Sequence, residues 1–490
     1  MTRDRWSRLA PGVRLGALLA LFCVPGAAAQ TRLTLRQAIA IGLEEGDRIK
    51  AAEAGREAAR YRDQAFYSDF LPRLSLSGTV PTYNRSIIQV VQPDGSTLFR
   101  PQNLTNSALT ATLAQRLPLT GGDLFVSSSL SRLAVSGQDD IKTWSSTPVR
   151  IGLRQQLFRP NTAGWDRREQ PLRAEVAERQ FLEAREDIAL EIVGRFFDVH
   201  AARAGLDNAT TNAAVNDTLY TLNQGRYEVG KIGENDLLQS ELALLRARTA
   251  VDGARLEYQR ALAALRLALG LSPSAEIEIE VEPVVPEVQA DTVVAVAEAL
   301  RNRATVTEAE LQHVQADRRV TEAKLTNSPG ATIEAAFGFN ATGPDVNLAY
   351  ENLLEARQFT LRVDVPLLQW GAHKESVRAA QADREQAAST RKTALEQTAQ
   401  DAHFAALELA QARRTLDLSA KADSVAGKRF EVAYNRYVIG RIAIDNLYLA
   451  QTEKDQALNQ FVQSLRGYWV SFFRLRRLTL FDFEAGRPIR

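Results

Sequence analysis

Cysteine, methionine and histidine are scarce in this chain of 490 residues, which contains one Cys, one Met and four His. Cys23 lies in a segment that we expect to be removed, so the mature chain should have no disulfide and no thiolate metal site. The histidines occur singly, without the paired spacing of a metal site. A Ser-x-x-Lys pattern at 389–392 lacks its companion motifs. We therefore predict no catalytic, metal or cofactor site, and hence no enzyme.

Long apolar runs and an excess of charge of one sign are also missing. Residues 1–29 combine four Arg, a short apolar core and small residues at 27–29, which is typical of a secretory signal peptide. After them, no run of about 18 apolar residues exists, so a membrane-spanning form would have to cross as strands. Loss of four Arg and one Asp with the signal takes the formal net charge from +1 to −2, which gives no reason to expect a nucleic-acid partner.

An internal repeat organises the rest of the chain. Arg-Tyr-Glu-Val-Gly at 226–230 returns as Arg-Tyr-Val-Ile-Gly at 436–440, 210 residues later, and each copy interrupts a long helical pattern. Pro72 and Pro329 each end a helix and open an alternating strand. The repeat predicts two copies of one unit: a helix, strands, a very long helix, a glycine turn and a return helix.

The repeat sets the expected boundaries. The first copy covers 30–270, with strands at about 73–158 and a hairpin tip near residue 230. An acidic linker follows at 271–290. The second copy covers 291–475, with strands at about 331–368 and a tip near residue 440, and a tail follows at 476–490. The first copy is longer, and we assign most of the excess to an extra strand hairpin around Gly121–Gly122.

Neither half of this unit can bury its apolar surface alone. The long helices would measure roughly 100 Å at 1.5 Å per residue, with an apolar stripe on one side. The strands alternate apolar residues such as Leu74 and Leu76 with Ser75 and Ser77, which suits a tilted barrel wall with a wet interior. We therefore expect an oligomer, because the stripes and the strands both need neighbours.

The duplicated tip motif, in register with the Pro-to-strand junctions, resembles the TolC family of outer-membrane efflux proteins from about Thr34 to about Phe483. The resemblance implies a mostly α protomer with a membrane β-barrel segment. Three protomers would form a periplasmic helical tunnel and a shared outer-membrane barrel in a Gram-negative envelope. Four strands per protomer would give twelve in all, and an extra hairpin in the wall would give eighteen.

The same resemblance implies a passive exit duct of a tripartite efflux pump or type I secretion system. Its partners would be outer-membrane lipid, a periplasmic adaptor (membrane fusion protein) and, through the adaptor, an inner-membrane pump of the RND, ABC or MFS type. The alternative, from a different class, is a periplasmic coiled-coil scaffold whose strands form a small soluble cap.

The resemblance also assigns roles to the tips. The residues expected to dock the adaptor are Arg226, Tyr227, Val229, Gly230, Arg436, Tyr437, Ile439 and Gly440. The candidate aperture gate comprises Asp236, Tyr437, Arg441, Asp445 and Asn446, with Tyr437 able to hydrogen-bond to Asp236. Arg441 stands one residue from the family position, and Asn446 replaces an acidic residue, which argues against a strongly electronegative ring. For the Arg and Tyr residues, the alternative role is helix C-terminal capping.

Two aromatic residues, Phe158 and Trp370, fall at equivalent strand-to-helix junctions. They are interpreted either as part of an aromatic girdle at a membrane interface or as a plug of the joint between strands and helices.

Overall fold

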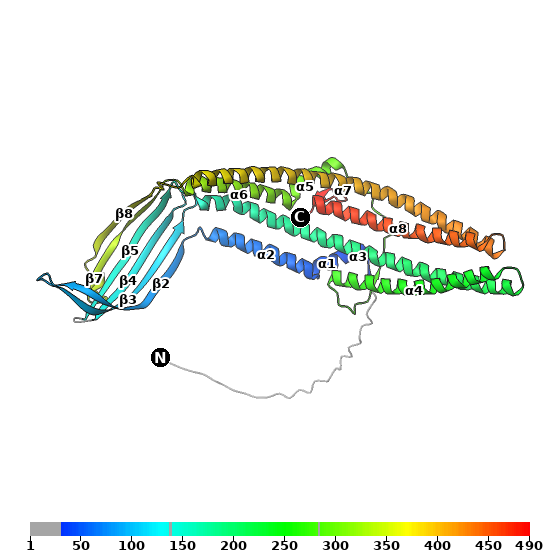
Figure 1. Cartoon of the computed structure of the whole chain (residues 1–490), viewed down its shortest axis with the longest axis horizontal. Helices are drawn as coiled ribbons and strands as arrows, with labels where there is room; N and C mark the ends of the chain where they lie inside the picture. The colour runs from blue at the N-terminus through cyan, green and yellow to red at the C-terminus, as the bar shows by residue number, and fades with distance from the viewer. Residues whose placement is uncertain (1–30, 137–139, 283–284) are drawn as a thin grey trace, which may run out of the picture.

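The computed structural model describes residues 31–136, 140–282 and 285–490, so the predicted signal peptide and Cys23 lie outside the described residues. The molecule is elongated, with a β-sheet at one end and two helical tips at the other (Figure 1). The first described helix, α1 (Leu35–Glu44), begins at the predicted N-cap, where Thr34 and Gln37 form a capping box.

The two-repeat organisation is confirmed by the helices. The helices α3 (Thr162–Glu228) and α7 (Ala372–Val438) each contain 67 residues. Their return helices α4 (Glu234–Leu269) and α8 (Ile444–Thr479) each contain 36. Corresponding ends are all 210 residues apart. The sheet is reached in each repeat through a shorter helical pair: α1 with α2 (Asp47–Ser68), and α5 (Thr292–Asn302) with α6 (Ala304–Thr326).

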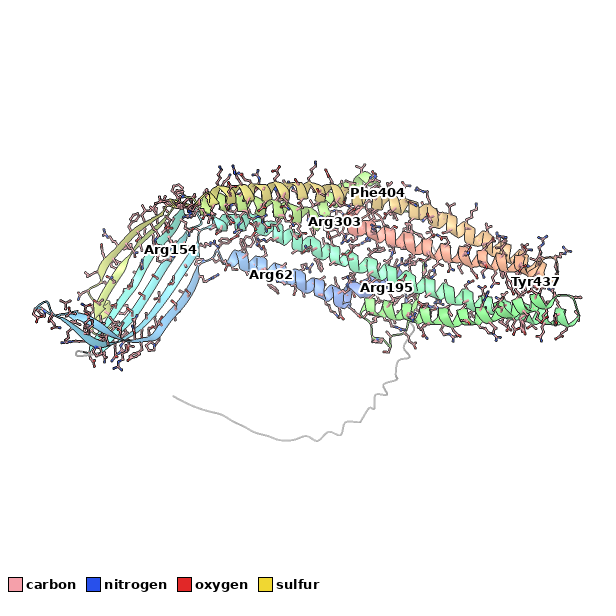
Figure 2. All side chains as sticks on the ribbon, in the orientation of Figure 1. Arg62, Arg154, Arg195, Arg303, Phe404 and Tyr437 are labelled. Carbon is pink, nitrogen blue, oxygen red and sulfur yellow. The ribbon has the colours of Figure 1, made fainter. Side chains whose placement is uncertain are left out.

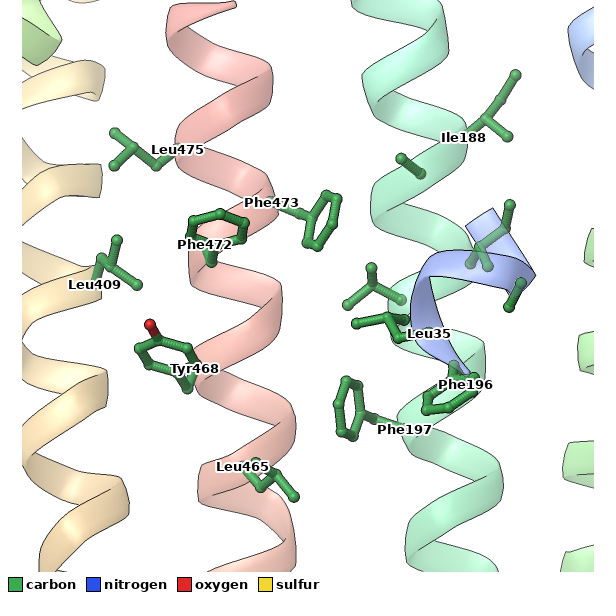
Figure 3. Packing of buried hydrophobic residues seen from close by; sticks show 14 of the residues in the cluster. Leu35, Ile188, Phe196, Phe197, Leu409, Leu465, Tyr468, Phe472, Phe473 and Leu475 are labelled. Atoms are coloured by element: carbon green, nitrogen blue, oxygen red, sulfur yellow. The ribbon is translucent and has the colours of Figure 1, made fainter. Parts of the chain in front are cut away.

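The hydrophobic core lies midway along the helices, where the repeats meet. Phe197 of α3 and Phe473 of α8 point into the space between these two helices, and Phe196 lies on the side of α3 next to α1 (Figure 3). Tyr468 points to the other side of α8, toward Leu409 of α7. All five side chains are buried. Burial of this aromatic surface is the main contribution that holds the two hairpins together in the protomer.

Arginine–carboxylate pairs flank the core between α3 and α8. Arg476 Nε lies 3.2 Å from Glu186 Oε2, and Arg477 Nε lies 2.9 Å from Asp187 Oδ1. Because Arg476 and Glu186 are largely shielded from solvent, each charge needs the other to offset its loss of hydration. The pairs therefore fix the register of α8 along α3.

Six antiparallel strands form one sheet in the order β2-β3-β4-β5-β7-β8. Their bounds are β2 (Arg73–Val91), β3 (Thr97–Arg116), β4 (Asp123–Ser136), β5 (Ile141–Leu157), β7 (Gly330–Gly343) and β8 (Leu354–Asp364). The turn at Gly121 joins β3 to β4, so the extra hairpin lies inside the sheet, between β2 and β5. Asn161 Nδ2 donates to the carbonyls of Pro118 and Leu119, both at 3.0 Å, and ties this turn to the start of α3.

Two segments differ from the expected boundaries. Within the predicted linker, β6 (Ile277–Ile279) pairs in parallel with β1 (Thr31–Leu33), and the Tyr468 hydroxyl donates to the Pro286 carbonyl, so this segment packs on the core. Helix α8 continues past residue 475 to Thr479, because Leu475 and Leu478 extend its buried stripe. The short strands β9 (Phe481–Asp482) and β10 (Arg487–Pro488) then pair in the tail.

The central core gives a stability prediction. Phe196→Ala removes a wholly buried ring and should cost about 3–5 kcal/mol through lost burial and the cavity left behind. We expect the thermal midpoint of the purified protein, followed by far-UV circular dichroism, to fall by about 5–10 °C. The control Phe196→Leu keeps most of the apolar volume and should fall much less. Equal midpoints for Phe196→Ala and the unaltered protein would contradict this account of the core.

Candidate functional site

The tip motif is a helix C-terminal cap in both repeats. Gly230 and Gly440 have φ angles of 71° and 76°, in the left-handed region that glycine adopts at little cost. The N–H of Gly230 donates to the Tyr227 carbonyl at 2.9 Å, and the N–H of Lys231 donates to the Arg226 carbonyl at 2.8 Å. The second tip repeats both bonds. This pair of bonds is the Schellman motif, and it explains the spacing from Arg to Gly.

The same cap also occurs away from the tips. At the end of α4, Gly270 donates to the Leu267 carbonyl and Leu271 donates to the Arg266 carbonyl, at 3.2 and 3.0 Å. The glycine turn by itself therefore defines how a helix ends, not what it binds. What distinguishes the tips is the set of side chains that they present.

The two tips differ in what they expose. Val229 and Ile439 are 66% and 62% exposed at the turns, and Tyr227 is partly exposed. Tyr437, at the equivalent position of the second repeat, is 4% exposed. Tyr437 lies at the tip end of the molecule, opposite Arg154 in the sheet (Figure 2). Its side chain is therefore not free to dock a partner in the protomer, contrary to its place among the predicted docking residues.

Tyr437 and Arg226 join the two tips instead. The Tyr437 hydroxyl donates to Asn223 Oδ1 of α3 at 2.6 Å. Arg226 Nη2, also on α3, donates to the carbonyls of Tyr437 and Val438 at 3.2 and 2.8 Å. The Arg226 guanidinium lies over the Tyr437 ring, 5.2 Å from its centre. The predicted capping role of Arg226 is thus exerted on α7 of the other hairpin.

The predicted hydrogen bond between Tyr437 and Asp236 is absent from the protomer. The Tyr437 hydroxyl is already donated to α3, whereas Asp236 lies in the first turn of α4 and has no side-chain hydrogen bond to any described residue. Asp445 accepts from Gln239 Nε2 at 2.8 Å. Arg441 and Asn446 are exposed, also without a side-chain partner among the residues described. The candidate gate residues therefore divide between two separate contacts.

A polar seam between the hairpins escaped the sequence analysis. Asn208 and Asn212 of α3 each donate from Nδ2 to the carboxylate of Asp455 on α8, both at 2.8 Å. Asn216 and Asn223, nearer the tip, are buried. The first three asparagines are spaced by four residues, a signal that could have predicted one polar helix face. The hairpins are thus joined by apolar packing at mid-length and by polar contacts toward the tips.

Several buried polar atoms of this seam have no partner. Among the described residues, Asn216 Oδ1, Asn223 Nδ2 and the Tyr448 hydroxyl are buried without a hydrogen bond. Burial raises the pKa of Tyr448 to about 12, so its hydroxyl remains neutral at physiological pH. Unsatisfied buried polar groups are costly, which makes the seam weaker than the apolar core.

At the other end of the molecule, the sheet has one apolar and one polar face. Leu74, Leu113, Val126, Ile151 and Phe337 follow one another across five strands on the apolar face. An exposed apolar surface of this extent marks a membrane or protein contact.

The opposite face of the sheet carries Ser, Thr and a charged group. There Arg154 Nη2 lies 3.2 Å from Glu334 Oε2, and Arg150 Nη2 donates to Gln358 Oε1 at 2.6 Å. These contacts connect β5, β7 and β8. Polar residues on one face and apolar residues on the other are what a barrel wall with a water-filled interior requires.

The junction aromatic residues remain exposed. Phe158 is 72% and Trp370 is 89% exposed, and both have positive φ angles, 56° and 50°. In the protomer neither ring fills the joint between strands and helices. Both residues lie in the connection between the last strand of their repeat, β5 or β8, and the long helix that follows.

No group of three or more metal-ligating side chains is found in residues 31–136, 140–282 and 285–490. Within the same ranges, no helix has the length and apolarity needed to cross a membrane.

The fold of this elongated chain is similar to that of solved outer-membrane channels. A model of the family described as "Outer membrane efflux protein" matches residues 114–271. The CmeC outer membrane channel of Campylobacter jejuni shares the fold with a TM-score of 0.67 and 15% identity, over 93% of this chain and 86% of CmeC. VceC of Vibrio cholerae does so with a TM-score of 0.66 and 14% identity, over 93% and 97% of the two chains. The family model covers about a third of the chain, and the two solved channels share its fold over nearly its whole length.

A curated relative is similar in sequence over part of the chain. Protein CyaE of Bordetella pertussis (strain Tohama I) is 24% identical over 200 residues, which are 40% of this chain. The match spans 42% of CyaE, less than half of that relative.

The cross-tip contact gives a prediction with a matched control, because Arg226 and Arg436 occupy the same position in the two repeats. Arg226→Ala removes charge-assisted hydrogen bonds to the last carbonyls of α7, a loss of about 1.5–3 kcal/mol. We expect amide hydrogen exchange in the last turn of α7 to become about tenfold to a hundredfold faster. Arg436 is exposed, and Arg436→Ala should leave that exchange unchanged. Equal effects of the two substitutions would refute the conclusion that Arg226, and not Arg436, stabilises the end of α7.

Proposed function

We propose that this protein is the outer-membrane exit duct of a tripartite efflux pump or type I secretion system. The observation that carries the proposal is a sheet with one apolar and one polar face, joined to two long helical hairpins. Three protomers would cover the sheet edges and helical stripes that one protomer leaves open. The sheets would form a barrel in the outer membrane, and the hairpins would extend it as a periplasmic tunnel.

Transport through such a duct is passive. The chain needs no nucleotide or metal for this role, because a path and a gate suffice when an inner-membrane pump supplies the energy. A pump of the RND, ABC or MFS type would be reached through a periplasmic adaptor. Val229 and Ile439 support adaptor docking, because they expose apolar side chains at the end of the molecule.

Gating in this proposal depends on the contacts between the hairpins at the tips. Tyr437, Asn223 and Arg226 hold α7 against α3 within one protomer. Asp236 and Arg441, which lack side-chain partners among the described residues, would then act between neighbouring protomers. Opening would require the polar seam to separate while the apolar core at mid-length stays packed.

The first test is the conductance of the purified, detergent-extracted protein in planar bilayers, with its mass in detergent determined alongside. A trimer with discrete channel events is the expected result, together with heat-modifiable migration and recovery in the outer-membrane fraction. A monomer or dimer found in the soluble periplasmic extract, without conductance, would favour the coiled-coil scaffold instead.

A second test addresses the gate. Asp236→Ala together with Tyr437→Phe should raise the single-channel conductance, because the Asn223 contact and the free carboxylate are both lost. The control is Tyr227→Phe, at the equivalent but partly exposed position, which should conduct like the unaltered channel. If the double substitution leaves the conductance unchanged, these residues stabilise helix ends and do not lock the tip.

A third test addresses docking. A photo-crosslinking amino acid placed at Val229 or Ile439 should give adducts with a periplasmic adaptor in intact cells, whereas one at the buried Leu447 should not. With the crosslinking amino acid at Val229, Ile439→Asp should reduce the adduct yield and leave the trimer and its conductance intact, because only an exposed apolar contact is lost. Adducts of equal yield at all three positions would argue against tip docking.

A further inference from the structure

The extra hairpin of the first repeat, β3 with β4, occupies the middle of the sheet. In the second repeat, the chain enters the sheet on β7 and leaves on β8; in the first it enters on β2 and leaves on β5. The hairpin therefore adds two strands between entry and exit. We propose that it crosses the outer membrane as part of the barrel wall, so that three sheets of six strands close an eighteen-stranded barrel. This inference rests on the proposed function.

The register of the strands supports a position in the wall. Moving one strand by one residue would exchange its two faces, so a shared apolar face requires a matched register across every pair. Each of the five strand pairs has this match. The facing apolar residues are Leu74 with Leu113, Leu113 with Val126, Val126 with Ile151, Ile151 with Phe337, and Ala335 with Phe359.

The hairpin is also long enough to span a bilayer. The pairing of β3 with β4 runs without interruption from Arg116 opposite Asp123 to Asn103 opposite Ser136, more than the roughly 9–11 residues that a tilted strand needs. Its turn lies at the helix end of the sheet, where Asn161 holds it. A hairpin serving as an external loop or a plug would need neither this length nor an apolar face continuous with its neighbours.

The free edges of the sheet allow three copies to close. The edge strand β2 runs away from the helices, and the other edge strand, β8, returns to them. β8 of one protomer can therefore pair antiparallel with β2 of the next. With strands about 4.8 Å apart and tilted by about 40°, eighteen strands give a backbone diameter of about 36 Å, against about 24 Å for twelve.

The lumen would be wide and hydrated. On the polar face, the hairpin contributes small side chains, among them Thr110, Thr112, Ser127 and Ser129. The one ring beside them on this face of β4, Phe125, lies against Gly152 and under the Arg150 guanidinium. The barrel would therefore admit hydrated solutes too wide for a twelve-stranded barrel, and the helical tips would be the narrowest part of the duct.

Single-cysteine labelling tests this arrangement in the full-length protein. Cys23 is the sole cysteine and lies in the predicted signal peptide, so the mature protein is expected to be a cysteine-free background. A fluorophore is attached at Leu113→Cys or Val126→Cys on the apolar face of the hairpin, and the protein is placed in vesicles containing brominated lipid. We expect quenching equal to that at the control positions Ile151→Cys and Phe337→Cys, on β5 and β7. At Thr112→Cys and Ser127→Cys, on the polar face, the label should remain unquenched.

The controls separate the two proposals. If Ile151→Cys and Phe337→Cys are quenched but Leu113→Cys and Val126→Cys are not, the hairpin lies outside the wall and the exit duct stands without it. If none of the four is quenched, both proposals fail. Electron-microscopy views along the trimer axis give an independent measurement. A barrel of about 36 Å is expected, and one of about 24 Å would overturn the eighteen-stranded wall.

Discussion

The exposed apolar surface of an extended protomer is the constraint on which the rest of this structure depends. The sheet is a single layer, and in the part of the chain that the structure describes no α-helix covers either of its faces. One face presents Leu, Val, Ile and Phe side chains, and the edges β2 and β8 leave backbone hydrogen-bonding groups open. Such surfaces are stable only against lipid and other protomers. The proposed oligomeric channel would cover all of them together.

The interface between the two hairpins changes character along its length. At mid-length, Phe196, Phe197 and Phe472 make an apolar core whose separation would expose large rings to water. Toward the tips, Asn212 and Asp455 replace such residues, and some buried polar atoms lack partners. Polar contacts can be exchanged for contacts with water at small net cost, whereas apolar packing cannot. The contact between the hairpins is therefore strongest at the apolar core and weaker toward the tips.

The sheet shows how the first repeat can contain two additional strands while the long helices of both repeats keep the same length. Adding β3 and β4 introduces one strand in each direction, so the chain still leaves the sheet toward the helices. The lengths of α3 and α7 remain equal at 67 residues, and the spacing of 210 between corresponding helix ends is kept. Asn161, at the start of α3, caps the helix and also holds the added turn. The additional residues of the first repeat are thus confined to the sheet.

The sequence by itself determined the repeat, the helix lengths, the strand alternation and the glycine turns, because these follow from local periodicity and from the backbone freedom of Gly230 and Gly440. Tertiary structure decided which residues meet. The two Arg-Tyr pairs are identical in sequence, yet Tyr437 is buried against Asn223 while Tyr227 is partly exposed. Arg226 caps the other hairpin for the same reason: α3 lies between its own return helix α4 and the second hairpin, and contacts between helices about two hundred residues apart depend on packing that no local pattern records.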